Sequence, residues 1–169
     1  FNNFFYNRIV FFNFCSKNRI HHLHPSLISD ESTSLVASQI FEGLVKLNSK
    51  SLDVEPCLAK SYDFNPTTFV YSFKLRDNIY FHNNKCFKDG VGRKVTVDDV
   101  IYTFKNICTK QIVNGGYHNT LKGVVKGVED YFNGESNDIS GIRAINKSTI
   151  EIELHRPNGL FLKRLAGIN

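Results

Sequence analysis

The sequence has no tryptophan and no methionine, and its four cysteines form no C-x-x-C pair. The cysteine spacing therefore excludes the usual ligand pattern of a zinc site. No apolar run is long enough to cross a bilayer, and no block of like charge exceeds two residues. The cations behind the net charge of +5 are scattered, so they indicate a solvated surface and predict no nucleic acid partner.

The composition that remains is typical of a globular protein. The 169 residues are 41% apolar and 22% charged, which is enough to bury a core and argues against disorder. The chain contains 15 Phe and begins at Phe1 without any Met, so we expect it to be a piece of a longer gene product. Its even number of cysteines permits disulfides in an oxidising compartment without requiring them.

Residues 1–18 differ from the rest of the chain. A short apolar run, IVFFNF, follows Arg8 and precedes Cys15, as the apolar part of an export signal follows a cation. Asn13 interrupts the run, and the residues just before Cys15 are bulky where a lipidation site has small ones. This segment predicts either an atypical flank or a degraded export signal.

The stretch Lys88–Thr96, KDGVGRKVT, contains two glycines and two cations ahead of a helical pattern, as phosphate-binding loops do. The phosphate-loop pattern requires Gly-Lys followed by Ser or Thr, whereas Arg93 precedes Lys94 and Val95 follows it. We therefore predict a turn and a capped helix start, with Thr96 as the N-cap and an aspartate three residues on.

The sequence offers little for catalysis or for metal binding. Adjacent carboxylates at residues 98–99 and 129–130 point in different directions on a helix, so they cannot face one substrate together. No Ser or Cys lies in a nucleophile motif, and the HHLH cluster at residues 21–24 is of a kind that is more often incidental than metal-binding. We predict no catalytic residue, no cofactor and no metal, and a hydrolase is kept as an alternative.

Periodicity predicts helices interleaved with antiparallel strands. A helix is expected from residue 30 to Gly43, with Asp30 or Ser32 as its cap, and a short strand and turn are expected after it, in LVKLNSKSL. Apolar and polar residues alternate over Phe69–Arg76, which indicates a strand with one buried face, and Asn78–His82 is expected to pair with it. The second half predicts helices over 97–108 and 125–132, a hairpin over 141–154 and a last helix after residue 157. This order favours an α/β or α+β layered fold over a doubly wound parallel sheet.

Several segments resemble one family in the same order along the chain. The similarity covers Arg19 to the end, and it is to the extracellular solute-binding proteins of family 5, the oligopeptide-, dipeptide- and nickel-binding components of ABC importers. The segments that carry it are HPSLISDESTSLVASQIFEGLVKLN, EPCLAKSYDF, FVYSFKLRDNIYFHNNKCFKDGVGRKVTVDDVIYTFKNI, VKGVEDYFNG and ISGIRAINKSTIEIELHRPNGLFLKRLA. No single motif is decisive, but their order is specific.

The resemblance implies a partial periplasmic-binding-protein fold of type II. Residues 19–48 are then the start of lobe I, and residues 49–169 are the small extra domain of the peptide-binding class, with the second lobe absent. The implied protein captures short peptides, or a related small solute, outside the cytoplasmic membrane. It delivers them to an ABC permease, does no chemistry itself, and is expected to be a monomer that is periplasmic or anchored outside the membrane. A structural or adhesive module, or the remnant of a degraded gene, is the alternative.

The resemblance also implies ligand-binding residues. Ser29, Asp30 and Glu31 match the segment that approaches the main chain of the peptide, and Tyr117 lies near an aromatic residue that lines the cleft. For Asp30 and Glu31, helix capping is an equal interpretation.

A disulfide between Cys57 and Cys86 is a further hypothesis, because the segments that carry the two cysteines are expected to lie close together.

Overall fold

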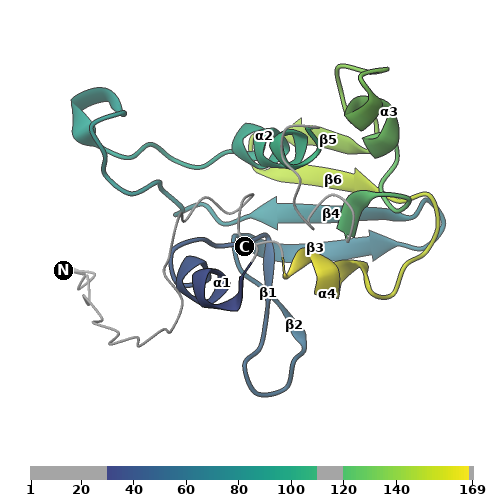
Figure 1. Ribbon diagram of the computed structural model, residues 1–169, viewed down its shortest axis with the longest axis horizontal. Helices are drawn as coiled ribbons and strands as arrows, with labels where there is room; N and C mark the ends of the chain where they lie inside the picture. The colour runs from purple at the N-terminus through teal and green to yellow at the C-terminus, as the bar shows by residue number, and fades with distance from the viewer. Residues whose placement is uncertain (1–29, 110–119, 168–169) are drawn as a thin grey trace.

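The computed structural model describes residues 30–109 and 120–167. Its centre is a four-stranded antiparallel sheet in the order β3-β4-β6-β5 (Figure 1). Strand β4, from the first half of the chain, pairs with β6 from the second half, so one sheet joins the two halves. The strands are β3 (Ala59–Asn65), β4 (Val70–Leu75), β5 (Ile142–Asn146) and β6 (Thr149–Glu153).

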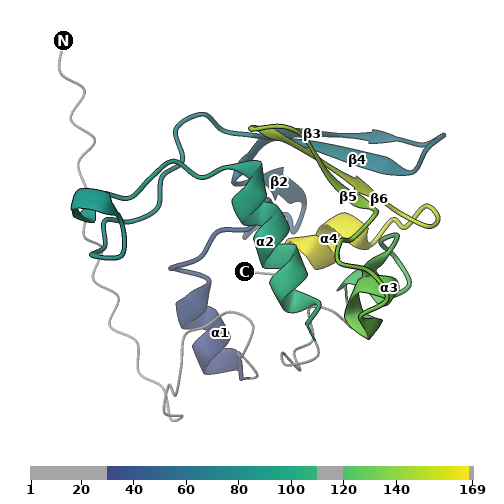
Figure 2. The ribbon, with the colours of Figure 1, turned by 90° about the horizontal axis from the view of Figure 1, so that it is seen from above.

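Three helices cover one face of this sheet, and within the described residues the opposite face has no cover (Figure 2). They are α2 (Val97–Ile107), α3 (Val128–Asn133) and α4 (Phe161–Leu165). The core lies between the helices and the sheet, and α2 contributes four buried residues at helical spacing. The layered α+β arrangement predicted from the sequence is confirmed.

The alternation in β4 explains which face is buried. Tyr71 and Phe73 point into the core opposite Ile152 and Ile150 of β6, whereas the half-buried Ser72 and the exposed Lys74 lie on the opposite face. The predicted one-sided strand is confirmed, except that it begins one residue later and ends one residue earlier. Phe69, expected in the strand, lies in the preceding turn with a φ of 58°.

Strand β3 was not predicted, and an irregularity in its pairing gives the reason. Its register against β4 shifts between Ala59 and Ser61, so the buried Ala59 and the half-buried Tyr62 and Phe64 share one face although their numbers differ in parity. Because the bulge interrupts the period of two, a search for strict alternation misses the strand.

Helix α1 (Glu31–Ala37) and the hairpin of β1 (Val45–Leu47) and β2 (Val54–Pro56) precede the sheet. The predicted continuation of the helix to Gly43 is wrong, whereas the short strand predicted after it is confirmed as β1. The Ser38 hydroxyl donates to the Leu35 carbonyl at 2.8 Å, and the chain turns before it enters β1. The predicted domain boundary after residue 48 falls in the turn of this hairpin.

Residues 78–94 form an arm that extends beyond the end of the sheet, with the short helix η2 (Lys88–Gly90) at its tip (Figure 1). The expected pairing of Asn78–His82 with β4 is wrong, because β3 and β6 already occupy both edges of β4. The segment pairs instead with the returning half of the arm, where the Phe81 N–H donates to the Arg93 carbonyl at 3.0 Å.

The predicted start of α2 is confirmed. The Asp99 carboxylate accepts from the Thr96 N–H at 2.9 Å, which is the reciprocal bond of a capping box. Arg93 donates two hydrogen bonds to the same carboxylate, one of them at 2.7 Å. This pairing lowers the pKa of Asp99, first through the hydrogen bond from Arg93.

Candidate functional site

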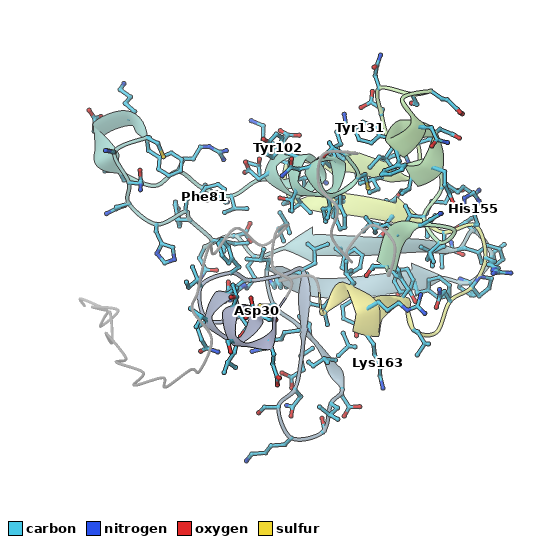
Figure 3. All side chains as sticks on the ribbon, in the orientation of Figure 1. Asp30, Phe81, Tyr102, Tyr131, His155 and Lys163 are labelled. Atoms are coloured by element: carbon cyan, nitrogen blue, oxygen red, sulfur yellow. The ribbon has the colours of Figure 1, made fainter. Side chains whose placement is uncertain are left out.

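The predicted ligand segment lies at the start of α1. Asp30 is half-buried, and its Oδ1 accepts from the Thr33 N–H at 2.8 Å, which makes it the N-cap of the helix (Figure 3). Glu31 follows in the first turn and is exposed. The capping interpretation of Asp30 is thus observed, while contact with a ligand stays a prediction for both residues.

The other two predicted ligand residues, Ser29 and Tyr117, lie outside the described residues. The same is true of the HHLH cluster at residues 21–24 and of the flank at residues 1–18. The structure therefore brings together only Asp30 and Glu31 of the predicted set, as neighbours in sequence.

The predicted disulfide between Cys57 and Cys86 is absent, because both cysteines are free in the structure. Cys57 follows β2 and donates its N–H to the Leu44 carbonyl beside the core. Cys86 lies two residues before η2, near the tip of the arm, which Figure 1 shows well away from the β1-β2 hairpin. The expected closeness of the two segments was wrong because the arm leads the chain away from the sheet.

The uncovered face of the sheet carries a hollow of about 420 Å³, which we call the outer-face hollow. It forms where the outward residues of three strands line up across the sheet: Ser72 of β4 lies opposite Glu151 of β6, which lies opposite Arg143 of β5. Its walls are polar or charged apart from one valine. They consist of Asp63, Asn65, Thr68, Val70, Ser72, Arg143, Glu151 and Glu153.

Charge pairing inside the outer-face hollow is nearly complete. Arg143 donates to Glu153 at 2.7 Å and lies 3.5 Å from Glu151, and Lys126 also donates to Glu153. The hydrogen bonds from Lys126 and Arg143 lower the pKa of Glu153. Such a paired network stabilises the sheet, and Asp63 is the carboxylate of the hollow that forms no ion pair among the described residues.

Sequence reasoning did not find this hollow, although a signal was present. The alternation in TIEIEL places two glutamates on one strand face, and the hairpin turn at residues 147–148 brings Arg143 opposite Glu151. The missing information was the long-range pairing of β4 with β6, which adds Ser72 to the same row.

The described residues offer neither a metal site nor a membrane-spanning helix. No group of three or more His, Cys, Asp and Glu side chains in that part of the chain could hold a metal ion. None of the helices there combines the length and apolar character that crossing a bilayer requires.

Comparison with known proteins gives a consistent result. A family model described as "Bacterial extracellular solute-binding proteins, family 5 Middle" matches residues 53–169. Among curated proteins, heme-binding protein A of Haemophilus influenzae is 32% identical over 83% of this chain and 25% of its own length. The dipeptide-binding protein of Escherichia coli is 28% identical over 90% of this chain and 28% of its own length.

Solved structures show the same similarity in three dimensions. A periplasmic oligopeptide-binding protein of Borrelia burgdorferi superposes with a TM-score of 0.73 at 32% identity, over 87% of this chain and 28% of its own. The chain spans about a quarter of the length of the curated relatives it matches. Its α+β layers therefore correspond to part of a periplasmic binding protein, as predicted.

Proposed function

Because the chain belongs to the bacterial extracellular solute-binding proteins of family 5, we propose that it is part of the substrate-binding component of an ABC importer. This component captures short peptides outside the cytoplasmic membrane and delivers them to the membrane permease. The observation that carries the proposal is the family match over residues 53–169, together with the superposition on an oligopeptide-binding protein. The division at residue 48 into lobe I and the extra domain belongs to the same proposal.

A binding role without catalysis agrees with the chemistry of the described residues. The carboxylates of the outer-face hollow are mostly paired with cations, and the relatives reported above are named as binding proteins. Peptide capture needs hydrogen bonds to a peptide backbone, which are indifferent to side chains, and waters that adapt to varied side chains. We propose that Ser29, Asp30, Glu31 and Tyr117 supply part of this contact.

The test is calorimetric titration of the full product of the gene that encodes this chain. Short peptides of two to five residues are the probe, with single amino acids and Ni²⁺ as other arms. We expect saturable binding of peptides and none of single amino acids. Binding of Ni²⁺ alone, or of no solute in a correctly exported and folded protein, would contradict peptide transport.

Variants of Asp30 separate ligand contact from capping. Asp30→Ser keeps a good N-cap, so we expect unchanged stability, whereas the loss of a carboxylate contact weakens peptide binding about tenfold. Asp30→Ala loses the cap as well. Tyr117→Ala is expected to weaken peptide binding, and Tyr102→Ala is its control because Tyr102 is an exposed residue of α2. Unchanged affinity in Asp30→Ser would limit Asp30 to capping.

Haem is a second candidate ligand, because the relative with 32% identity is named a heme-binding protein. A haem titration followed by absorbance in the Soret region belongs beside the peptide titration. Competition between haem and peptide would indicate one shared site, while haem binding without peptide binding would replace the proposed substrate.

A further inference from the structure

A second hollow lies where three separate segments meet at one end of the sheet. Its volume is about 240 Å³, and we call it the cationic hollow. The segments are the end of β4 with the residues after it, the base of the arm just before α2, and the turn between β5 and β6. Its walls are Leu75, Arg76, Asp77, Lys94, Val95, Thr96, Lys147 and Ser148.

Backbone hydrogen bonds fix these segments to one another. The Leu75 N–H donates to the Ser148 carbonyl at 2.7 Å, and the Val97 N–H donates to the Lys147 carbonyl at 3.3 Å. The base of the arm is held in turn by the bond from the Val95 N–H to the Ile79 carbonyl at 3.0 Å. The relative positions of the walls are therefore set by the fold and do not depend on flexible side chains alone.

The charges on these walls are unbalanced. Arg76, Lys94 and Lys147 supply three cations, whereas Asp77 is the only carboxylate in the walls. Lys94 lies 3.9 Å from Asp77, and both side chains are substantially exposed, so this ion pair is weak. The Lys147 ammonium has no partner among the described residues.

Arg76 contributes a guanidinium group to the walls of the hollow. Its Nη2 lies 3.3 Å from Glu42, and both side chains are substantially exposed, so this ion pair is also weak. Guanidinium and ammonium groups are also the side chains that most commonly hold phosphate and carboxylate.

Asp99, at the start of α2, does not neutralise the cations of the hollow. Its carboxylate accepts two hydrogen bonds from Arg93, and neither residue lines the hollow. The hollow therefore has cations from three segments, and the ion pairs of Arg76 and Lys94 are both weak.

We propose that the cationic hollow binds a small oxyanion group, a phosphate or a carboxylate, between Arg76, Lys94 and Lys147. This site is not the phosphate loop that was rejected for the KDGVGRKVT stretch. Only Lys94, Val95 and Thr96 of that stretch line the hollow, and none of its glycines does. It is also independent of the transport proposal, because none of the residues proposed to contact a peptide lines it.

The test is a titration of the ¹⁵N-labelled chain with inorganic phosphate, followed by amide chemical shifts at constant ionic strength. We expect saturable shifts at Asp77, Val95 and Ser148, which line the hollow. Chloride at equal ionic strength is expected to produce none. A parallel titration with succinate distinguishes a carboxylate site from a phosphate site by the tighter of the two affinities.

Matched variants locate the site. Lys147→Gln is expected to weaken oxyanion binding about fivefold to tenfold, since it removes one charge-assisted hydrogen bond, and Arg76→Gln is expected to do the same. Lys163→Gln is the control, because Lys163 lies on α4 and points to solvent away from the hollow (Figure 3). Lys147 is exposed, so its variant should fold normally. Absent saturation with both anions, or equal weakening by Lys163→Gln, overturns the proposal.

Discussion

A side chain at residue 92 would collide with the other half of the arm. A Cβ built on Gly92 would lie 1.8 Å from the Phe81 carbonyl oxygen, and the Gly92 N–H already donates to Asn83 at 3.0 Å. The two halves of the arm approach so closely because this residue has no side chain. The shape of the arm at this point therefore depends on Gly92.

We expect Gly92→Ala to open the base of the arm. Because the backbones must separate, the hydrogen bond from the Phe81 N–H to the Arg93 carbonyl should weaken, and exchange of the Phe81 amide should accelerate about tenfold or more. Gly159→Ala is the control, since nothing lies within 4 Å of a Cβ at that position. Equal exchange rates at Phe81 in both variants would contradict this account of the arm.

The three described cysteines should differ in reactivity. Cys86 is exposed, burial raises the pKa of the half-buried Cys57, and burial raises the pKa of Cys108 to about 12. Since the thiolate is the reactive form, alkylation without reductant should be fast at Cys86, slower at Cys57 and absent at Cys108 until the protein unfolds. Peptide mass spectrometry after timed alkylation measures this order. Protection of both Cys57 and Cys86 until a reductant is added would instead indicate the disulfide.

At the scale of elements, one carboxylate, that of Glu153, holds the ion pairs on the outer face of the β5-β6 hairpin. Glu153 accepts from Arg143 of the neighbouring strand and from Lys126, which precedes α3. It thus ties the sheet to the segment that leads into a helix on the other face. Its side chain is 19% exposed, so solvent screens these pairs only in part.

The contribution of Glu153 to stability should depend on pH. Its pKa is lowered in the folded protein from an ordinary value of 4.5, so the contribution is complete above pH 4.5 and is lost as the pH falls through the lowered value. We expect Glu153→Gln to reduce the free energy of unfolding by about 1 kcal/mol at neutral pH, and the difference from wild type to shrink in acid.

Urea denaturation at several pH values measures this difference. Glu135→Gln is the control, because Glu135 is exposed and its side chain has no partner among the described residues. A difference for Glu153→Gln that stays constant down to the lowest pH at which the protein folds would rule out the ion pairs as its origin.

At the scale of the molecule, α4 closes the core from the far end of the sequence. Phe161 is fully buried, and its ring lies 5.2 Å from that of Tyr71 in β4. Helix α4 also contacts β1, so it connects the sheet with the hairpin that precedes it. A helix of five residues has little stability of its own, so its position depends on this packing.

Phe161→Ala is therefore expected to reduce the free energy of unfolding by about 3–5 kcal/mol, since it leaves a cavity between α4 and the sheet. Leu160→Ala is the matched control, because Leu160 is adjacent in sequence and 55% exposed. Thermal unfolding followed by circular dichroism measures both. A loss for Leu160→Ala as large as for Phe161→Ala would show that α4 is not anchored by the buried ring.

The sequence by itself determined the features that depend on neighbouring residues. Helix α2 with its Thr96 cap, strand β4 and the β5-β6 hairpin were predicted because a period of 3.6 or 2 and a capping residue are local properties. The order of segments also determined the family, which the family match confirmed.

Only the tertiary structure decided which strands pair and where the arm goes. The pairing of β4 with β6 joins residues about 80 positions apart, and no local pattern encodes such a contact (for example Ser72 with Glu151, 79 positions apart). Once β3 and β6 occupied both edges of β4, Asn78–His82 had no strand to join and became the arm. Both hollows follow from these long-range pairings, because each is lined by residues that are distant in sequence and brought together by backbone hydrogen bonds across the sheet.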